Sequence, residues 1–263
     1  MDLGLRGKVA IIAAASKGLG FAVASELARE GAEVAICART AADLEIAARS
    51  IGKETGRAVF WQAVDVTDAV QVQKFVEAVE KRHGRVDICV TNTGGPPAKK
   101  FAELSVEEWR AAVDQMLMSA VYFARAVLPL MRQNRWGRFI TITSVSVKQP
   151  IDGLMLSNSI RAAVAGLART LANEYGLDGI TVNNVCPGYT LTDRLEELAA
   201  NLAQDSGEPP EKIYERWSAQ TPLRRLGRPE EFAAAVAFLA SERAGYINGV
   251  SLAVDGGLAR GLL

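Results

Sequence analysis

The sequence has few of the residues from which metal centres and disulfide frameworks are built. Its 263 residues include three cysteines, Cys37, Cys89 and Cys186, which lie far apart and each within an apolar run. We expect them to be small buried side chains rather than disulfide partners. The only histidine, His83, lies in a charged stretch. This composition argues against a metal site and against a serine-histidine hydrolase site.

The chain also has no excess charge of one sign and no long apolar run. Thirty lysine and arginine residues balance thirty aspartate and glutamate residues, so no long-range field would attract nucleic acid or an anionic membrane. No basic-then-apolar signal precedes the first strand-like run, and no apolar run reaches the roughly 18 residues that span a bilayer. We expect a cytoplasmic protein with neither nucleic acid nor a membrane as its partner.

What the chain does have is the pattern of an α/β protein. Apolar residues make up 49% and charged residues 23% of the sequence, and no linker divides it, which indicates one domain over residues 1–263. Segments of helical periodicity alternate with apolar runs typical of buried parallel strands, at 9–14, 33–38, 58–64, 86–91, 137–143, 180–186 and 250–254. This alternation predicts a single-domain, doubly wound parallel sheet of about seven strands, the Rossmann fold.

One long segment, at about residues 189–228, has no strand pattern. It contains Pro209, Pro210 and Pro222 together with amphipathic pieces such as 191–204. An insertion after a late strand of an open α/β sheet lies near the edge where ligands bind. We interpret the segment as a lid over the substrate, and the alternative is a surface helical hairpin or a contact between subunits.

A glycine-rich turn follows the first strand-like run. It reads Ser16-Lys17-Gly18-Leu19-Gly20 and leads directly into a helical segment. Glycines at such a turn let the backbone approach a pyrophosphate, and the helix N-terminus faces the anion with its amides and its dipole. A Gly-x-Gly is a weak signal by itself, but its place between the first strand and the first helix predicts a dinucleotide site.

The end of the second strand-like run indicates which dinucleotide binds. A carboxylate there would bind the ribose 2′-hydroxyl of NAD and repel a 2′-phosphate. The sequence instead has Ala38 followed by Arg39. Arg39 offers a planar fork to a phosphate, and Lys17 in the glycine turn supplies a second cation. NADP(H) is therefore the expected cofactor.

Short motifs also follow the later strand-like runs. In order along the chain they are Asp65-Val66, Asn92-Thr93-Gly94 and Pro187-Gly188 with Thr192. With the glycine turn, these motifs resemble the short-chain dehydrogenase/reductase family over nearly the whole chain, and in overall look its 3-oxoacyl-(acyl carrier protein) reductase-like members. The resemblance implies that the first pair contacts the adenine, that Asn92 and Gly94 belong to the cofactor site, and that the last segment contacts the nicotinamide carboxamide.

The glycine turn departs from the family pattern at its beginning. Ala13 and Ala14 stand where the family has a threonine and its first glycine. We therefore expect a slightly rearranged turn, in which Ala14 adopts a backbone conformation that an L-residue tolerates.

The resemblance also implies where the catalytic residues lie. In the family a serine, a tyrosine and a lysine act on the carbonyl, and an asparagine one helix earlier holds a water. Ser144 matches the serine, and its alternative role is a hydroxyl that satisfies local backbone. Ser157 stands at the tyrosine position, Arg161 at the lysine position and Met116 at the asparagine position.

These replacements change the chemistry that the site can perform. A serine hydroxyl is a far poorer acid than a phenol, whose pKa is about 10. The serine side chain is also too short to reach the position that a tyrosine hydroxyl would occupy. Arg161 keeps a positive charge that can hold the nicotinamide ribose and stabilise an alkoxide, but it cannot release a proton near neutral pH.

Three functions remain open. The one we favour is an oxidoreductase that reduces a carbonyl, or oxidises a hydroxyl, of a small or acyl substrate. Its proton would come from water, from the substrate, or from Tyr189 or Tyr214 of the lid. The second is an NADP-binding sensor or assembly partner without redox chemistry, and the third is a dehydratase or isomerase on the same fold.

The family resemblance further implies a symmetric homotetramer. It would be built from the long helices at 106–132 and 157–175 and from the C-terminal strand. Those helices would then carry apolar surface on more than one face.

Overall fold

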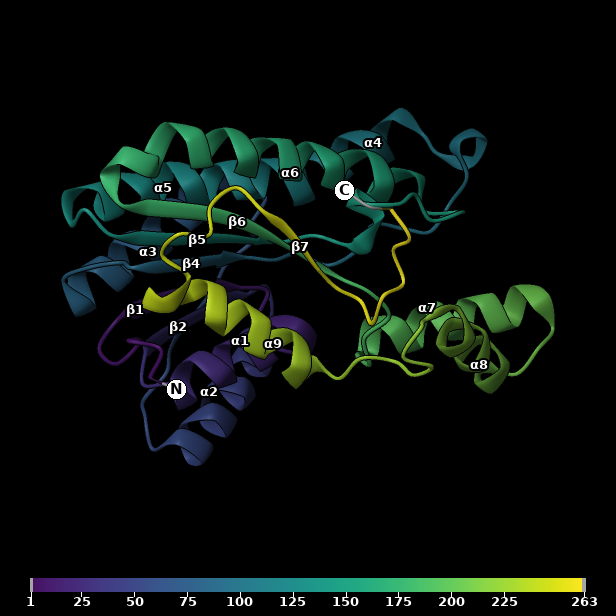
Figure 1. The fold of residues 1–263 in the computed structure, drawn as a ribbon, viewed down its shortest axis with the longest axis horizontal. Coiled ribbons are helices and arrows are strands. Elements are labelled where there is room, and N and C mark those ends of the chain that lie inside the picture. The colour runs from purple at the N-terminus through teal and green to yellow at the C-terminus, as the bar shows by residue number, and fades with distance from the viewer. Residues whose placement is uncertain (1, 262–263) are drawn as a thin grey trace.

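The computed structural model describes residues 2–261, and its centre is one parallel β-sheet (Figure 1). Seven strands pair in the order β3-β2-β1-β4-β5-β6-β7, and the pairings are parallel. The strands are β1 (Val9–Ala13), β2 (Glu33–Ala38), β3 (Phe60–Ala63), β4 (Ile88–Thr91), β5 (Gly137–Ile142), β6 (Ile180–Pro187) and β7 (Ser251–Val254). Each lies on an apolar run that the sequence marks as a strand, so the predicted single-domain, doubly wound sheet is confirmed.

Helices cover both faces of this sheet. One face carries α1 (Gly18–Arg29), α2 (Ala41–Thr55) and α9 (Pro229–Ala240), and the other carries α3 (Ala69–His83), α5 (Ser119–Gln133) and α6 (Met155–Tyr175) (Figure 1). Successive residues of β1 alternate between the two apolar cores, with Ile12 in the first and Ile11 in the second. Because both faces are covered, the strand is apolar at every position rather than at every second one.

A long helix crosses the second face. α4 (Val106–Ala112), a π-helical turn (Val113–Met118) and α5 run on without a break. Its 28 residues are long and apolar enough to cross a membrane by length and composition alone, but half of the most apolar window is buried inside the protein. A core helix has this composition because it packs on the sheet, as Phe123 and Val127 do here.

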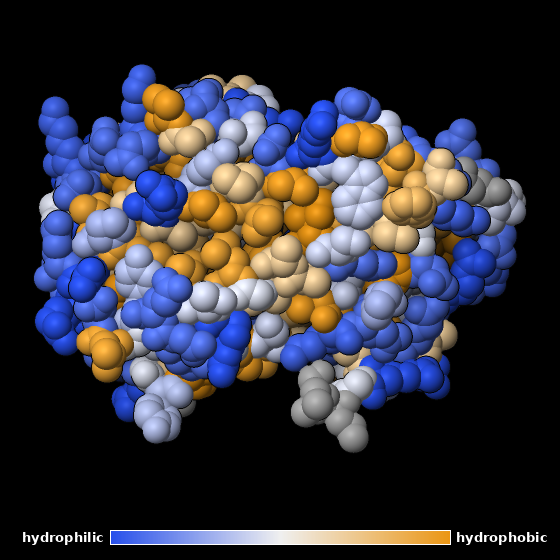
Figure 2. Space-filling model, turned by 90° about the horizontal axis from the view of Figure 1, so that it is seen from above, coloured by the Kyte–Doolittle hydropathy of each residue, from blue (hydrophilic) through white to orange (hydrophobic). Residues whose placement is uncertain are grey.

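Apolar side chains are also present on the outer surface of this layer. Figure 2 shows them gathered over the middle of the face formed by α5 and α6, with hydrophilic side chains around them. A face of this kind is what the expected homo-oligomer requires. The association itself stays a prediction.

The segment after β6 folds into two helices, α7 (Asp193–Ser206) and α8 (Pro210–Gln220). They lie beside the sheet, beyond the end of β6 (Figure 1). Ile213 and Trp217 of α8 pack on Leu195 and Ala199 of α7 in an apolar cluster of their own. A bridge between residues 190 and 227 closes the base of the segment. The helix pair therefore has its own small core and stands at the carboxyl edge of the sheet.

The turn between β1 and α1 combines left-handed backbone with very close packing. Ala14 has a φ of +49° and Gly18 a φ of +60°, both in the region that favours glycine. Ala14 therefore does not adopt an ordinary L-residue conformation, and the expectation that it would is wrong. A Cβ atom on Gly20 would lie 2.3 Å from the carbonyl oxygen of Ala14. Gly20 is thus required by the contact between the turn and the first turn of α1.

We predict that Ala14→Gly stabilises the protein. An alanine in the left-handed region costs about 1–2 kcal/mol. Glycine avoids this cost, but its greater freedom in the unfolded chain offsets part of the gain. The free energy of unfolding in urea should rise by up to about 1 kcal/mol. Ala13→Gly, one residue earlier in β1, should lower it instead. A fall with Ala14→Gly would show that the backbone at Ala14 is not strained.

Candidate active site

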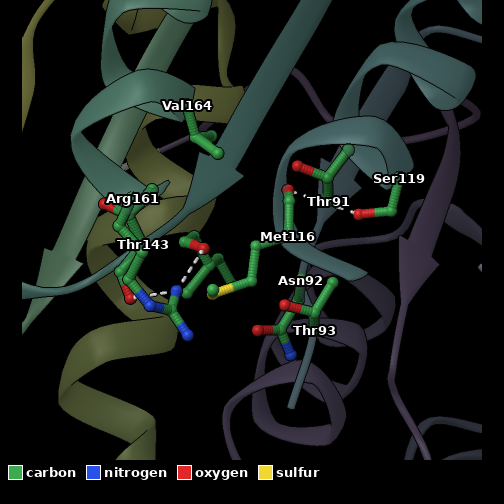
Figure 3. A pocket seen from close by; sticks show the side chains of 9 residues that line it. Thr91, Asn92, Thr93, Met116, Ser119, Thr143, Arg161 and Val164 are labelled. Carbon is green, nitrogen blue, oxygen red and sulfur yellow. Dashed lines mark hydrogen bonds between the residues drawn. The ribbon is translucent and has the colours of Figure 1, made fainter. Parts of the chain in front are cut away.

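Two of the four residues at the expected catalytic positions, Met116 and Arg161, meet at the carboxyl edge of the sheet. A small cavity there is lined by Thr91, Asn92, Thr93, Met116, Ser119, Ile142, Thr143, Arg161 and Val164. In Figure 3, Arg161 and Thr143 lie on one side of the cavity, Asn92 and Thr93 lie on the other, and Met116 projects between them. The ends of β4 and β5, the π-helical turn and α6 therefore supply the walls. The serine positions, Ser144 and Ser157, are not among the lining residues.

Arg161 is the main charge in this cavity. Its side chain is buried, and its Nη1 donates hydrogen bonds to the carbonyl oxygens of Thr143 (2.7 Å) and Ile142 (3.3 Å). Burial lowers the pKa of Arg161 to about 10, which leaves the guanidinium charged at neutral pH. Among residues 2–261 no carboxylate lies within ion-pair distance of it, and Arg161 is held by carbonyl dipoles alone.

Ser144 and Ser157 have different surroundings. The hydroxyl of Ser144 accepts a hydrogen bond from the backbone N–H of Ser146 (3.1 Å) and caps a short 3₁₀ turn (Val145–Val147). This is the local backbone role that sequence reasoning gave as the alternative for Ser144. Ser157 is buried on the first turns of α6, one turn before Arg161.

A buried polar network lies beside Arg161. The side-chain oxygen of Asn184 on β6 accepts hydrogen bonds from the hydroxyls of Thr141 (3.0 Å) and Thr143 (2.7 Å). The amide of Asn184 and the hydroxyl of Thr143 both contact the thiol of Cys186. Burial raises the pKa of Cys186, so the thiol stays neutral. The three cysteines are free and buried as expected, but sequence reasoning missed the hydrogen bonds at Cys186.

The segments assigned to the cofactor come together at the same edge. The side-chain amide of Asn92 lies 3.5 Å from the carbonyl oxygen of Ala14 in the glycine turn. A Cβ atom on Gly18 would contact Thr192 at 3.7 Å. Gly188 donates its N–H to Val254 of β7 (3.1 Å). Segments 14–20, 92–94 and 188–192 thus form one continuous wall.

The remaining cofactor positions lie around this wall. Ser16, Leu19, Val66 and Pro187 are half-buried, as is Asp65. The Asp65 carboxylate accepts hydrogen bonds from the backbone and the hydroxyl of Thr67. Arg39 is exposed just after β2. Lys17 is exposed as well, and its ammonium lies 3.3 Å from the carboxylate of Asp193 at the start of α7.

A second arginine, which sequence reasoning missed, connects the helix pair to the sheet edge. Arg194 of α7 donates a hydrogen bond to the carbonyl oxygen of Pro96 (2.9 Å), in the loop that follows β4. Its guanidinium also contacts Gly95, where a Cβ atom would lie 3.1 Å from Nε. The only sequence signal was a charged pair directly after Thr192. The helix pair is thereby tied to the rim of the cavity.

The two tyrosines of segment 189–228 lie away from this cavity. Tyr189 stacks on Trp217 with ring centroids 4.9 Å apart, and Tyr214 meets the same ring edge-on at 5.9 Å. Burial raises the pKa of Tyr189. Both rings belong to the apolar cluster of the helix pair. Within residues 2–261, no three His, Cys, Asp or Glu side chains gather in a way that could hold a metal ion.

Comparison with known proteins places this geometry in a family. The model of the enoyl-(acyl carrier protein) reductase family matches residues 13–259. The 3-oxoacyl-(acyl-carrier-protein) reductase FabG of Pseudomonas aeruginosa is 36% identical over 256 residues, 97% of this chain and 99% of that protein. Nodulation protein G of Azospirillum brasilense is 34% identical over 253 residues, 95% of this chain and 98% of that protein.

A solved structure agrees with the sequence matches. The L-sorbose reductase of Gluconobacter frateurii, complexed with NADPH and L-sorbose, superposes with a TM-score of 0.95 at 36% identity, and the match covers 100% of both chains. Sequence and fold thus agree over almost the full length. The chain belongs to the short-chain dehydrogenase/reductase family of NAD(P)-dependent oxidoreductases.

Proposed function

We propose that this chain is an NADP(H)-dependent oxidoreductase that reduces a carbonyl, or oxidises the corresponding hydroxyl, of a small or acyl substrate. The observation that carries the proposal is the buried cation of Arg161 at the sheet edge, beside the wall formed by segments 14–20, 92–94 and 188–192. A dinucleotide site and a charged group for carbonyl chemistry are therefore neighbours. NADPH in the L-sorbose reductase complex supports the same assignment.

The residues at the end of β1 fit a dinucleotide. The turn has no side chain at Gly18 or Gly20, so the backbone can approach a pyrophosphate, and the turn leads directly into the N-terminus of α1. Asn92 and Gly94 would line the middle of the site, and Pro187, Gly188 and Thr192 the nicotinamide end. Asp65 and Val66 would lie at the adenine.

The proposed preference for NADP(H), which carries a 2′-phosphate, depends more on Arg39 than on Lys17. No carboxylate stands at the end of β2, where Ala38 is followed by an exposed arginine. Lys17 is held by Asp193, but both side chains are exposed, and an exposed pair of this kind contributes about 0–1 kcal/mol. A doubly charged phosphate can therefore compete for Lys17.

On the substrate side, the chain supplies charge rather than an acid. Bound NADPH would supply the hydride. Ser144 accepts a hydrogen bond from Ser146 and keeps its O–H free, so it would orient the substrate oxygen by donating to it. Arg161 would stabilise the negative charge that develops on that oxygen. Tyr189 and Tyr214 are engaged with Trp217, which favours water or the substrate itself as the proton source. Ser157 would have no direct part.

One observation favours a second function. Neither Ser144 nor Ser157 lines the cavity that contains Arg161, as in a protein that binds NADP(H) without turning it over. Such a chain would be a sensor or an assembly partner. The experiments below separate the two.

We predict that Arg39→Ala weakens NADPH binding. Loss of one charge-assisted contact at an exposed site should raise the dissociation constant for NADPH about tenfold. The constant for NADH should not change, because NADH has no 2′-phosphate. Titration of each cofactor by fluorescence measures both. Arg49→Ala, at an exposed arginine of α2, is the matched control. An unchanged preference for NADPH in Arg39→Ala would show that the charge argument is wrong.

We predict that Ser157→Ala lowers carbonyl reduction by less than about tenfold. Loss of a true general acid would lower it by roughly 10²–10⁴-fold. Steady-state kcat with NADPH, measured alongside cofactor affinity, decides between these outcomes. A larger loss of kcat with affinity intact would make Ser157 a catalytic residue.

We predict weak but measurable turnover in the wild-type protein. Incubation with NADPH and a panel of ketones, oxoacyl thioesters and quinones should oxidise the cofactor, because Arg161 stabilises the developing charge even where proton transfer is slow. Ser144→Ala should be slower by about tenfold or more. If wild type and Ser144→Ala bind NADPH and are equally inert, the binding function replaces the enzymatic one.

A further inference from the structure

The start of α7 lies against the glycine turn that follows β1. A Cβ atom on Gly18 would lie 3.7 Å from the side chain of Thr192, the residue that caps α7. One residue further on, the carboxylate of Asp193 lies 3.3 Å from the ammonium of Lys17. Two successive residues at this helix start therefore contact the turn at which a dinucleotide of this fold places its pyrophosphate.

The next residue, Arg194, reaches the loop on the other side of the crevice between β1 and β4. Its Nη2 donates a hydrogen bond to the carbonyl oxygen of Pro96 (2.9 Å), just after the cofactor segment 92–94. The guanidinium lies so close to the backbone of Gly95 that a Cβ atom there would be 3.1 Å from Nε and 3.3 Å from Nη2. Three consecutive residues of α7 thus span the distance from the glycine turn to the loop after β4.

The guanidinium of Arg194 can form further hydrogen bonds. Among the side chains and backbone groups that the structure describes, it donates only to Pro96 and to the carboxylate of Glu197, and the second contact is long, at 3.4 Å. The side chains of Arg194 and Glu197 are both exposed, and such a pair contributes about 0–1 kcal/mol. A phosphate group can therefore replace Glu197 as the partner of Arg194.

The glycine turn supplies backbone donors but little free charge of its own. In the described part of the chain no side chain caps the first amides of α1, and its first turn has no acidic residue. Those amides can therefore bind an anion. Lys17 is paired with Asp193, so their charges cancel. Arg194 is then the remaining cation of this group.

Resting on the proposed function, we propose that Arg194 is a cofactor-binding residue whose guanidinium binds the pyrophosphate of the dinucleotide. The amides of α1 bind this group from the glycine turn, and Arg194 binds it from α7. Arginine suits the role because its planar fork matches phosphate oxygens. The pyrophosphate is common to both cofactors, so Arg194 strengthens the binding of NADPH and NADH alike, whereas Arg39 sets the preference between them.

Four ligands separate the roles of the two arginines in calorimetry. They are NADPH, NADH, ADP-ribose, which keeps the pyrophosphate without the nicotinamide, and 2′-AMP, which has no pyrophosphate. Arg194→Gln should raise the dissociation constants of the first three by the same factor, about tenfold, as expected for one charge-assisted contact. It should leave 2′-AMP unchanged. Arg39→Ala should instead weaken only NADPH and 2′-AMP. Arg216→Gln, which removes an arginine of α8 that pairs with Glu208, should bind all four as wild type does.

A salt titration distinguishes a direct contact from a structural role of Arg194. Salt screens a contact between charges, so the affinity of the wild type for ADP-ribose should fall more steeply with salt than that of Arg194→Gln. If Arg194 only anchored α7, the variant would bind more weakly with the same dependence on salt, and 2′-AMP would weaken as well. Either result would overturn the inference.

These binding measurements do not depend on turnover. If the wild type binds ADP-ribose through Arg194 but reduces no carbonyl, the proposed activity fails and the pyrophosphate contact stands. If the wild type oxidises NADPH while Arg194→Gln and Arg216→Gln bind ADP-ribose equally, the contact is overturned and the activity stands. Wild-type protein that binds neither NADPH nor ADP-ribose would overturn both.

Discussion

The parallel pairing of β1 with β4 determines where this chain can act. The strand order runs outward from β1 through β2 to β3 in one direction and from β4 through β7 in the other. Because crossovers in such sheets are right-handed, the connections after β1 and β4 leave toward opposite faces and open a crevice between the two strand ends. The hydrogen bond from Asn92 to Ala14 spans that crevice. Every segment assigned to the cofactor follows a strand end on one side of it or the other.

The architecture could be predicted from the sequence because burial of both faces makes parallel strands continuous apolar runs. Asn184 shows that a strand remains predictable even where a polar residue interrupts its apolar run. It lies within β6 beside a second asparagine, Asn183, and the structure accommodates it by pairing its amide with Thr141, Thr143 and Ser251 on the neighbouring strands. The two asparagines did not obscure the strand, since their hydrogen bonds are satisfied internally.

The details of the site could be predicted only in part. The family motif assigned Arg161 to a catalytic position. That Arg161 has no carboxylate within ion-pair distance depends on which residues fold around it, and the motif does not show this. Arg194 and Pro96 are 98 residues apart in sequence, and no local pattern encodes their contact. The π-helical turn at 113–118 could not be predicted either, because its residues are those of an ordinary helix. It positions Met116 in the cavity. The left-handed φ of Ala14 runs against the preference of its own residue type.

Three departures from local rules lie at one edge of the sheet, although left-handed backbone also occurs at Arg135 and Arg224, and a second buried arginine, Arg138, lies near the start of β5. A left-handed alanine, a π-helical turn and a buried arginine without a counter-ion each reduce stability, and all three lie around the same sheet edge. Natural chains break such rules mainly where function requires it. Packing alone would favour glycine at position 14 and an apolar side chain at position 161, since a buried apolar group needs no partner. Arg138 stacks on Trp136, whereas Arg161 lines the cavity, so we explain the charge retained at Arg161 by what binds beside it.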